Sequence, residues 1–315
     1  MRSAYPSHHE DILGSPGTAL PDEPATEFQQ EGVTPRQVAV FRRIIYRYYD
    51  DHARELPWRS TQDPYRILVS EIMLQQTQVE RVLVKYDEFL RKFPDFSTLA
   101  HADFRDVLRV WKGLGYNRRA LSLQAIALSV VSEFGGRLPD SPETLRTFPG
   151  IGPATAGALG AFAFHRPTVF METNIRRVFL HLFFPDRSGV RDTEILPLVE
   201  KTLDTDRVRT WYYALMDYGA MLKRTTANPN QRSAHHRRQA PFADSDREIR
   251  GLILKALLDR DALTDRELLK VVGRQKDRTR VLVDVLVKEG LLERQGDMIT
   301  ISPGTKGAPH PEDDR

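Results

Sequence analysis

The chain has 315 residues, enough for two domains of ordinary size, and its 40% of hydrophobic residues indicate a globular protein. Its 46 Lys and Arg nearly balance 43 Asp and Glu, but an isoelectric point near 9.0 permits a nucleic-acid partner if the basic residues gather on one face. The chain has no cysteine, which excludes disulfides, thiolate nucleophiles and cysteine-ligated metal or iron–sulfur sites.

The two ends of the chain differ in composition from its middle. Residues 1–32 and 302–315 are rich in polar residues, Gly and Pro without apolar periodicity, which predicts a disordered leader and a disordered tail. Residues 33–223 show repeated helical periodicity and few β-like runs, which predicts a mostly helical domain. Because no segment has the composition of a signal peptide or the length of a membrane span, we expect a cytoplasmic protein with no membrane partner.

The first motif is "SEIMLQQTQV", residues 70–79, on a helix that Asp63 is expected to cap and Pro64 to begin. Its apolar positions predict one helix through residue 86, and Glu71 falls beside the apolar stripe. A partly exposed glutamate is the alternative, but the glutamines that follow favour a surface that contacts polar matter without repelling phosphate. The polar residues of this stretch are Gln75, Gln76, Thr77 and Gln78.

The second motif is "TFPGIGPATAGALGAFAF", residues 147–164. Two glycines flank Ile151 in a turn expected to be too tight for ordinary residues, and Pro153 then begins a helix, so the pattern predicts two helices joined by a hairpin. Free backbone N–H groups and the helix dipole make such a turn an anion site that suits DNA phosphate, although a plain helix connection is the alternative. The residues expected at this site are Gly150, Ile151, Gly152 and Thr155.

The third motif is "TVFMETNIRRVFLHLFF", residues 168–184. A short β-branched and aromatic run is followed by Glu172 and Asn174 on a loop, and then by a helix with Arg176 and Arg177 in its first turn. The alternative reading is that Glu172 only caps this helix, which its dipole would favour.

A basic run, "KRTTANPNQRSAHHRR", follows at residues 223–238. It has five Lys or Arg, two His and no acids, so it predicts a flexible basic loop over residues 224–244, or simply a solvated face. His235 and His236 raise the alternative of a metal, but adjacent histidines point apart in most conformations.

Residues 245–301 show the pattern of capped helices followed by a hairpin. Ser245 with Glu248, and Thr264 with Glu267, are expected to form capping boxes at the start of two helices. A third helix over about residues 276–289 and a hairpin through Gly296 complete the pattern of an α+β winged-helix-like module, which binds either DNA or protein. Basic residues lie where the third helix begins, at Arg274, Lys276, Arg278 and Arg280.

Five motifs together resemble the helix-hairpin-helix DNA glycosylases, specifically the branch that removes adenine from A/G mismatches. They are "LPWR", "PYRILVSEIMLQQTQVERV", "VWKGLGYNRRALSL", "FPGIGPATAGAL" and "ETNIRRV", in this order, over roughly residues 38–223. The resemblance implies an all-α, two-lobed enzyme that flips a base out of the duplex. It also implies a monomer, a nucleoid location, and double-stranded DNA with a mispaired or damaged base as the partner.

The resemblance assigns catalytic roles to three residues. It makes Glu71 the general acid that protonates adenine, a role that needs a raised pKa, and an apolar helix flank raises the pKa of a carboxylic acid. It places Glu172 where the family has an aspartate followed by Gly-Asn, as the ionised carboxylate that stabilises the sugar cation, with Asn174 beside it. Glu172 keeps the charge on a side chain that is one methylene longer.

The resemblance also assigns contacts to DNA. Gln76 matches a wedge in the base stack, Tyr116 matches a residue that stacks beside the mismatch, and Arg59 matches the lining of the base pocket. The position of the lyase lysine holds Ala154, so we expect a monofunctional glycosylase. Arg237 and Arg238 of the basic run are expected to contact phosphate.

Two departures from the family matter. The family usually has four cysteines that bind an iron–sulfur cluster after the catalytic domain, whereas this chain has the basic run there, so we expect no cofactor and leave open a monovalent cation at the hairpin. The family usually ends in a Nudix-like domain that reads 8-oxoguanine, and about 57 residues cannot form one. The sequence therefore leaves open adenine opposite G, C or 8-oxoguanine, another deaminated or alkylated base, a catalytically weak DNA-structure-binding protein, and a transcription regulator built on the winged helix.

Overall fold

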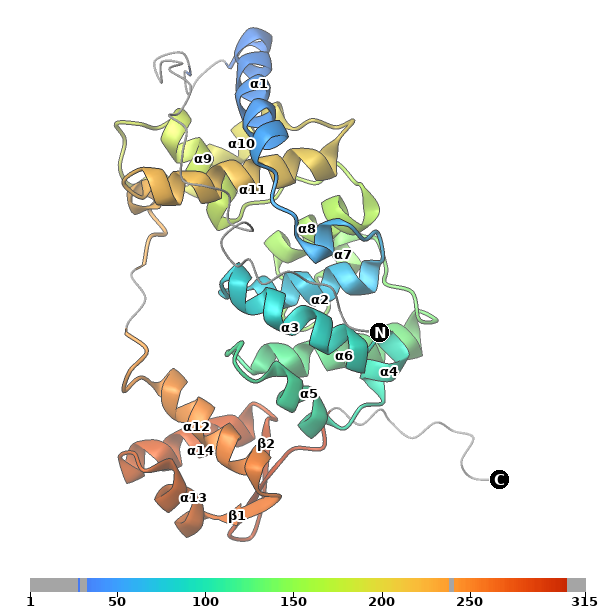
Figure 1. Cartoon of the computed structure of the whole chain (residues 1–315), viewed down its shortest axis with the longest axis vertical. Coiled ribbons are helices and arrows are strands. Elements are labelled where there is room, and N and C mark those ends of the chain that lie inside the picture. Colours follow the sequence, from blue (N-terminus) through green and yellow to red (C-terminus); the bar gives the residue numbers. More distant parts are fainter. Residues whose placement is uncertain (1–27, 29–32, 238–240, 305–315) are drawn as a thin grey trace, which may run out of the picture. The chain divides into compact units, whose positions relative to one another are not determined.

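The computed structural model describes residue 28 and residues 33–237 and 241–304 (Figure 1). They form two compact units, each made of two stretches of chain. The first unit comprises Met1–Gln62 and Ala156–Arg238, and the second comprises Asp63–Thr155 and Gln239–Arg315. The predicted helical domain over residues 33–223 is therefore divided between the units, and the C-terminal module belongs to the second. In the described part of the chain, no helix is long and apolar enough to cross a membrane.

The first unit is built around two long helices, α1 and α11. Its elements are α1 (Pro35–His52), η3 (Pro57–Arg59), most of α8 (Pro153–Phe164), α9 (Thr173–Leu182), α10 (Asp192–Thr202), α11 (Val208–Thr225) and η4 (Pro229–Arg232). α11 packs against α1 and α9. Stacked and edge-on aromatic rings fill the core between them, with Phe41 in contact with Phe179, Phe183 and Trp211. Phe28, within the predicted disordered leader, is buried against this cluster.

The second unit has α6 at its centre, packed against α2, α4 and α5. Its helices before the hairpin are α2 (Pro64–Leu74), α3 (Val79–Lys92), α4 (Phe96–Ala100), α5 (Phe104–Trp111), α6 (Arg118–Glu133) and α7 (Pro142–Leu145). Asp63 caps α2 and Pro64 begins it, as predicted. The predicted continuous helix through residue 86 is wrong, because α2 ends at Leu74 and α3 begins only at Val79.

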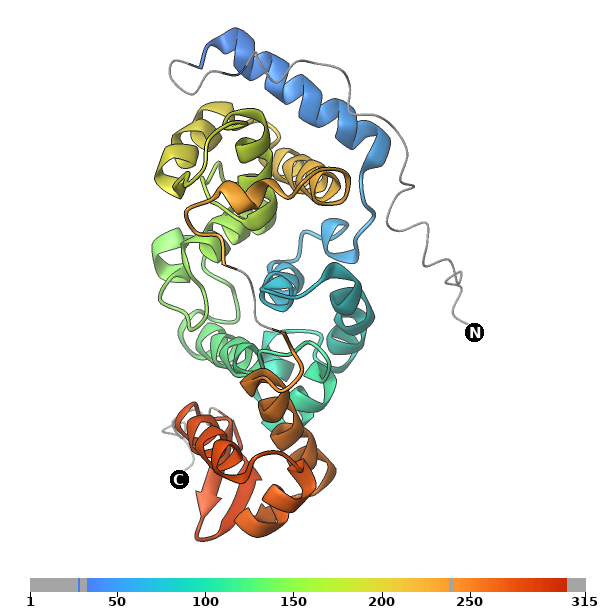
Figure 2. The same cartoon turned by 90° about the vertical axis from the view of Figure 1, so that its left-hand side faces the viewer.

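The C-terminal module is orange to red in Figure 2. It contains α12 (Asp246–Asp259), β1 (Ala262–Thr264), α13 (Asp265–Val272), α14 (Lys276–Lys288), β2 (Leu292–Gln295) and β3 (Met298–Ile301). The three helices and the β2–β3 hairpin match the prediction. β1 was not predicted; it completes an antiparallel sheet of order β1-β3-β2 in which Ala262 lies opposite Thr300. The module is tied to α5 by Arg105, whose guanidinium donates to the Leu257 and Asp261 carbonyls.

The two predicted capping boxes have different outcomes. Thr264 and Glu267 form a complete one at the start of α13. Ser245 accepts the Glu248 N–H, but the Glu248 carboxylate accepts from the backbone N–H of Asp244 instead of that of Ser245. The second half of this box is therefore displaced by one residue.

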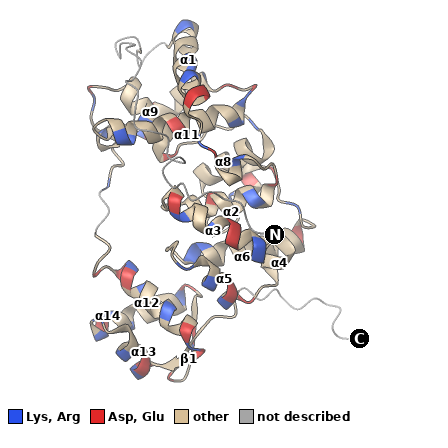
Figure 3. Cartoon of the chain, in the orientation of Figure 1, with Lys and Arg blue, Asp and Glu red and all other residues tan. Residues whose placement is uncertain are grey.

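Three of the four basic residues around the start of α14, Arg274, Arg278 and Arg280, are paired with acids of the same module. Arg274 contacts Glu248 at 3.0 Å, Arg278 contacts Asp246 at 2.7 Å, and Arg280 contacts Asp277 at 3.0 Å. Figure 3 shows Lys and Arg interspersed with Asp and Glu over this module. Such surface pairs add little stability, but they reduce the positive charge that this end of α14 offers to a phosphate.

The predicted flexible basic loop is partly folded. α11 continues to Thr225, and Pro229–Arg232 then form η4, which packs against α9. Pro229, Asn230 and Ser233 are buried. The expectation of a solvated loop is wrong here, because this stretch buries polar groups that hydrogen-bond to the rest of the first unit.

Candidate active site

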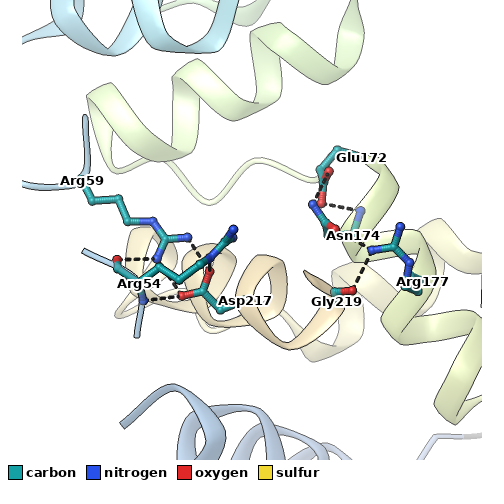
Figure 4. A network of polar contacts seen from close by, with 7 residues as sticks. All are labelled: Arg54, Arg59, Glu172, Asn174, Arg177, Asp217 and Gly219. Atoms are coloured by element: carbon teal, nitrogen blue, oxygen red, sulfur yellow. Dashed lines mark hydrogen bonds and ion pairs between the residues drawn. The ribbon is translucent and has the colours of Figure 1, made fainter. Parts of the chain in front are cut away.

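Glu172 is the N-cap of α9. Its carboxylate accepts the N–H groups of Asn174 at 2.7 Å and of Ile175 at 2.8 Å, and Asn174 Nδ2 donates to its other oxygen at 3.3 Å (Figure 4). The residue keeps some exposed surface, but protein atoms surround the carboxylate and desolvation is the largest influence, so its pKa is raised. The capping role that the sequence left as an alternative is thus real, and it fixes the carboxylate rather than leaving it mobile.

Arg177 holds the other end of the Asn174 amide. Its Nη1 donates to Asn174 Oδ1 and to the Gly219 carbonyl, both at 2.6 Å, and the residue is 3% exposed. Burial lowers the pKa of Arg177, whose charge in turn opposes the rise in the pKa of Glu172. Because Asn174 donates to a carboxylate and accepts from a guanidinium, the network sets the orientation of its amide.

Gly219 lets α11 approach α9 at this point. A Cβ on residue 219 would lie 2.7 Å from Asn174 Cβ and still closer to the Asn174 carbonyl oxygen. Any side chain would therefore push Asn174 away from its partners.

Arg59, a predicted pocket residue on η3, forms a buried ion pair with Asp217 of α11. Its Nη1 and Nη2 contact the two oxygens of Asp217 at 2.7 and 2.8 Å, and Arg54 Nε contacts Asp217 at 2.6 Å. The Arg59 guanidinium also lies 4.5 Å from the centre of the Tyr213 ring. Burial raises the pKa of Asp217, but the hydrogen bond from Arg59 and the two arginine charges outweigh burial and hold this pKa below its ordinary value.

α11 thus joins the two networks, since Asp217 and Gly219 are two residues apart on it (Figure 4). One end of this short stretch fixes Arg59, and the other fixes Arg177 and Asn174. Within the first unit, the structure brings together three residues predicted from the sequence, Arg59, Glu172 and Asn174.

In the second unit, Glu71 lies on α2 beside the buried face, as the sequence pattern predicts. It is half-buried, while its neighbours Ser70 and Ile72 are each 1% exposed. Ile67 and Leu68, one turn earlier on the same helix, are also buried.

The polar stretch after Glu71 lies in the turn between α2 and α3 and not on one helix face. Gln75 Nε2 donates to the Gly150 carbonyl at 3.1 Å and to Thr155 Oγ1 at 3.2 Å, so this turn is joined to the hairpin. Gln76 is exposed and has a φ of 54°, a conformation that non-glycine residues seldom adopt.

Arg119, which the sequence analysis did not single out, lies on α6 and binds the carbonyl groups at the C-terminal end of α2. Its guanidinium is buried and donates to the carbonyls of Ile72, Met73, Gln75, Leu114, Gly115 and Tyr116 and to the hydroxyl of Thr77. Burial lowers the pKa of Arg119 to about 10. The same guanidinium lies 5.5 Å from the ring of Tyr116, which, like Gln76, has a positive φ, of 46°. The Arg119 side chain therefore holds the backbone of Tyr116 and the two residues on either side of Gln76, Gln75 and Thr77.

The hairpin forms between α7 and α8. Gly150 has a φ of 80°, and a Cβ there would lie 3.3 Å from Ser122 Cβ, so glycine is needed. Gly152 lacks a positive φ and has open space around it, so the prediction that both glycines are conformationally required is wrong. Ile151 is buried, and the N–H groups in the first turn of α8 have no acceptor within the helix.

The sequence assigned phosphate contacts to Arg237 and Arg238 of the basic run. Arg237 is exposed, and Arg238 lies outside the described residues. Among the described residues, Arg237 takes no part in either carboxylate network.

Comparisons with known proteins show the family to which the chain belongs. The model of the HhH-GPD superfamily base excision DNA repair proteins matches residues 69–197. The adenine DNA glycosylase of Mycolicibacterium smegmatis is 35% identical over 272 residues, which cover 79% of this chain and 92% of that protein. The chain belongs to the adenine DNA glycosylase family. The human adenine DNA glycosylase is also 35% identical, over 58% of this chain and 36% of its own length.

Among solved structures, a thermostable thymine-DNA glycosylase superposes with a TM-score of 0.53 and 27% identity, over 60% of this chain and 88% of its own. The family, the superfamily match and these neighbours make the protein a DNA glycosylase of base excision repair.

The residues present do not fit the family's iron–sulfur cluster. Such a cluster is held by cysteine thiolates, and the chain has none. Among the residues that the structure describes, no group of three or more His, Cys, Asp or Glu is placed to hold a metal ion.

Sequence reasoning missed five residues of these networks: Arg54, Arg119, Arg177 as a partner of Asn174, Asp217 and Gly219. A signal existed for Arg119, because it shares one helical stripe with buried Leu123, Ile126 and Val130. A charge on an apolar stripe points to a buried hydrogen-bonding role.

Proposed function

We propose that the protein is a monofunctional adenine DNA glycosylase that removes adenine mispaired with guanine or 8-oxoguanine from double-stranded DNA. The observation that carries this proposal is a pair of glutamates, each at a partly buried position of its own unit. Glu71 lies beside the apolar face of α2, and the Glu172 carboxylate is held by Asn174, which Arg177 orients.

The proposed reaction is hydrolysis of the N-glycosidic bond. Glu71 donates a proton to the adenine, so that the bonding electrons leave with a neutral base rather than an anion. The ionised Glu172 stabilises the positive charge that develops on the sugar carbon. Water then adds to that carbon and gives up a proton, which returns Glu71 to its acid form and leaves an abasic site. In this scheme the ionised form of Glu172 is favoured first by the N–H groups of Asn174 and Ile175 and then by the positive charge of Arg177, all of which oppose the effect of burial on its pKa.

The proposed DNA contacts lie in the second unit, which also contains Glu71. The first turn of α8 offers N–H groups and a helix dipole to a phosphate, and Gln75 fixes this hairpin to the end of α2. Gln76 and Tyr116 are proposed to enter the base stack, and their positive φ angles are the kind of local strain that functional positions hold.

Ala154 occupies the position at which lyases of the superfamily place a lysine, and alanine cannot form a Schiff base. The protein should therefore release a base without cutting the strand. Trapping of a stoichiometric borohydride adduct with abasic DNA would overturn this part of the proposal.

A second candidate is excision of a different base, which the similarity to a thymine-DNA glycosylase favours. A single-turnover assay on duplexes with A opposite 8-oxoguanine, A opposite G, T opposite G, uracil, hypoxanthine or an alkylated purine separates the two. Alkali-sensitive cleavage at adenine, lost in Glu71→Gln, supports the proposal. Release of another base alone supports the second candidate, and tight duplex binding without release of any base contradicts both.

A further inference from the structure

The segment after α11 lies along α9. We call residues 228–234 the strap. Asn228 begins it, and its Oδ1 accepts from Arg177 Nε at 3.2 Å and from the Asn230 N–H at 3.3 Å. Pro229 and Asn230 are both buried, so this Asn-Pro-Asn turn is part of the folded unit.

Asn230 reaches the first residue of α9. Its Nδ2 donates to the Thr173 carbonyl at 3.0 Å, and Thr173 stands between Glu172 and Asn174 in the chain. The two asparagines therefore contact the start of α9 in two ways, one through the Arg177 side chain and one through the backbone.

The strap is also fixed at the other end of α9. Arg232 Nη2 donates to the Leu180 carbonyl at 2.7 Å, and the strap backbone exchanges hydrogen bonds with Val190 at 3.0 and 2.8 Å. Because it is held at both ends of α9, the strap cannot shift without moving the helix.

We propose that the strap positions the catalytic groups: Asn228 and Asn230 set Arg177 and the first turn of α9, which in turn set Asn174 and Glu172. This inference rests on the proposed function for its kinetic part. Asn228 and Asn230 touch neither base nor sugar in this scheme, so they are positioning residues. The chain has no cysteine, so no cysteine-bound cluster holds the strap, and these hydrogen bonds keep it in place.

The variants are chosen to separate positioning from folding. Asn228→Ala removes the acceptor of Arg177 Nε, whereas Asn228→Asp keeps an oxygen there and serves as the conservative rescue. Asn230→Ala removes the bond to Thr173. Gln231→Ala, an exposed residue of the same strap, is the matched control.

In the full-length protein, Asn228→Ala and Asn230→Ala should lower the single-turnover excision rate about 10- to 100-fold, because small misplacements of catalytic groups are costly. Affinity for the same duplex should be unchanged. In Asn228→Ala the acid limb of the pH–rate profile should move to higher pH, since a displaced Arg177 opposes the rise in the pKa of Glu172 less strongly. Gln231→Ala should behave like the wild type, and Asn228→Asp, which keeps the acceptor of Arg177 Nε, should retain most of the excision rate at neutral pH.

Hydrogen exchange gives a test that does not need activity. The amides of Asn174 and Ile175 donate to Glu172, and they should exchange faster in Asn228→Ala but not in Gln231→Ala. If the wild type releases no base, the proposed function fails while this exchange still tests the strap. A lower melting temperature with unchanged rate, pH profile and exchange in both asparagine variants would overturn the positioning role, as would full wild-type behaviour.

Discussion

Gly219→Ala tests the close approach of α11 to α9. Replacing a glycine inside a helix by alanine normally stabilises a protein by about 0.5–1 kcal/mol. At residue 219 the added methyl group would lie 2.7 Å from Asn174 Cβ and closer to its carbonyl oxygen, and backbone cannot move aside as a flexible side chain can. Such overpacking costs about 1–3 kcal/mol, so we expect a net loss of about 1–2 kcal/mol.

The chain provides a matched control in Gly251, which lies inside α12 with open space around the position of a Cβ. Urea unfolding should show Gly251→Ala gaining about 0.5–1 kcal/mol while Gly219→Ala loses stability. The excision rate should also fall in Gly219→Ala alone, because Asn174 is displaced from Glu172. Equal stabilisation by the two substitutions would refute the close contact.

Three further predictions follow from the networks. Arg119→Lys keeps the charge but cannot reach all its acceptors, so urea unfolding should show a loss of about 1–3 kcal/mol; wild-type stability would contradict its role. The pKa of Asp217 is lowered by folding, so its contribution to stability is present above its unfolded pKa of about 3.9 and is lost as pH falls through its folded pKa. Asp217→Asn should therefore flatten the acid side of the stability curve measured by unfolding between acidic and neutral pH, and an unchanged curve would count against the ion pair. The pKa of Glu172 is raised and its ionised form is required. As the pH is lowered, the excision rate should therefore begin to fall while the pH is still above the ordinary glutamate pKa of about 4.3. Asn174→Ala should move this acid limb of the pH–rate profile to still higher pH. An acid limb at the ordinary value would show that Glu172 is not the titrating group.

Features set by neighbouring residues were predictable from the sequence. Asp63 and Pro64 begin α2, and Thr264 with Glu267 closes the capping box of α13, because each of these signals acts within one helical turn. The position of Glu71 beside the buried face followed from the same local periodicity.

Features set by distant residues were not predictable. α2 ends where it does because Arg119, 44 residues after Gln75, takes the carbonyls of its last turn. The basic run folds because Asn230 finds the Thr173 carbonyl 57 residues earlier in the chain. A single sequence does not reveal such pairs, since propensity describes only the local chain.

At the site itself, the partner of Arg59 was also not predictable from the sequence. The resemblance placed it at the base pocket, but its buried partner, Asp217, is 158 residues away in the sequence. Its guanidinium is committed to that carboxylate, so it contributes to the site through a fixed position rather than as a mobile cation.

The most direct test of the central claim is the single-turnover excision rate of Glu71→Gln, measured with its affinity for the same adenine mismatch duplex. Glutamine keeps the shape of the side chain but cannot donate the proton of a carboxylic acid. The account predicts a rate about 10²–10⁴-fold below that of the wild type with unchanged affinity. Excision by Glu71→Gln at the wild-type rate would contradict the assignment of the general acid, and with it the proposed mechanism.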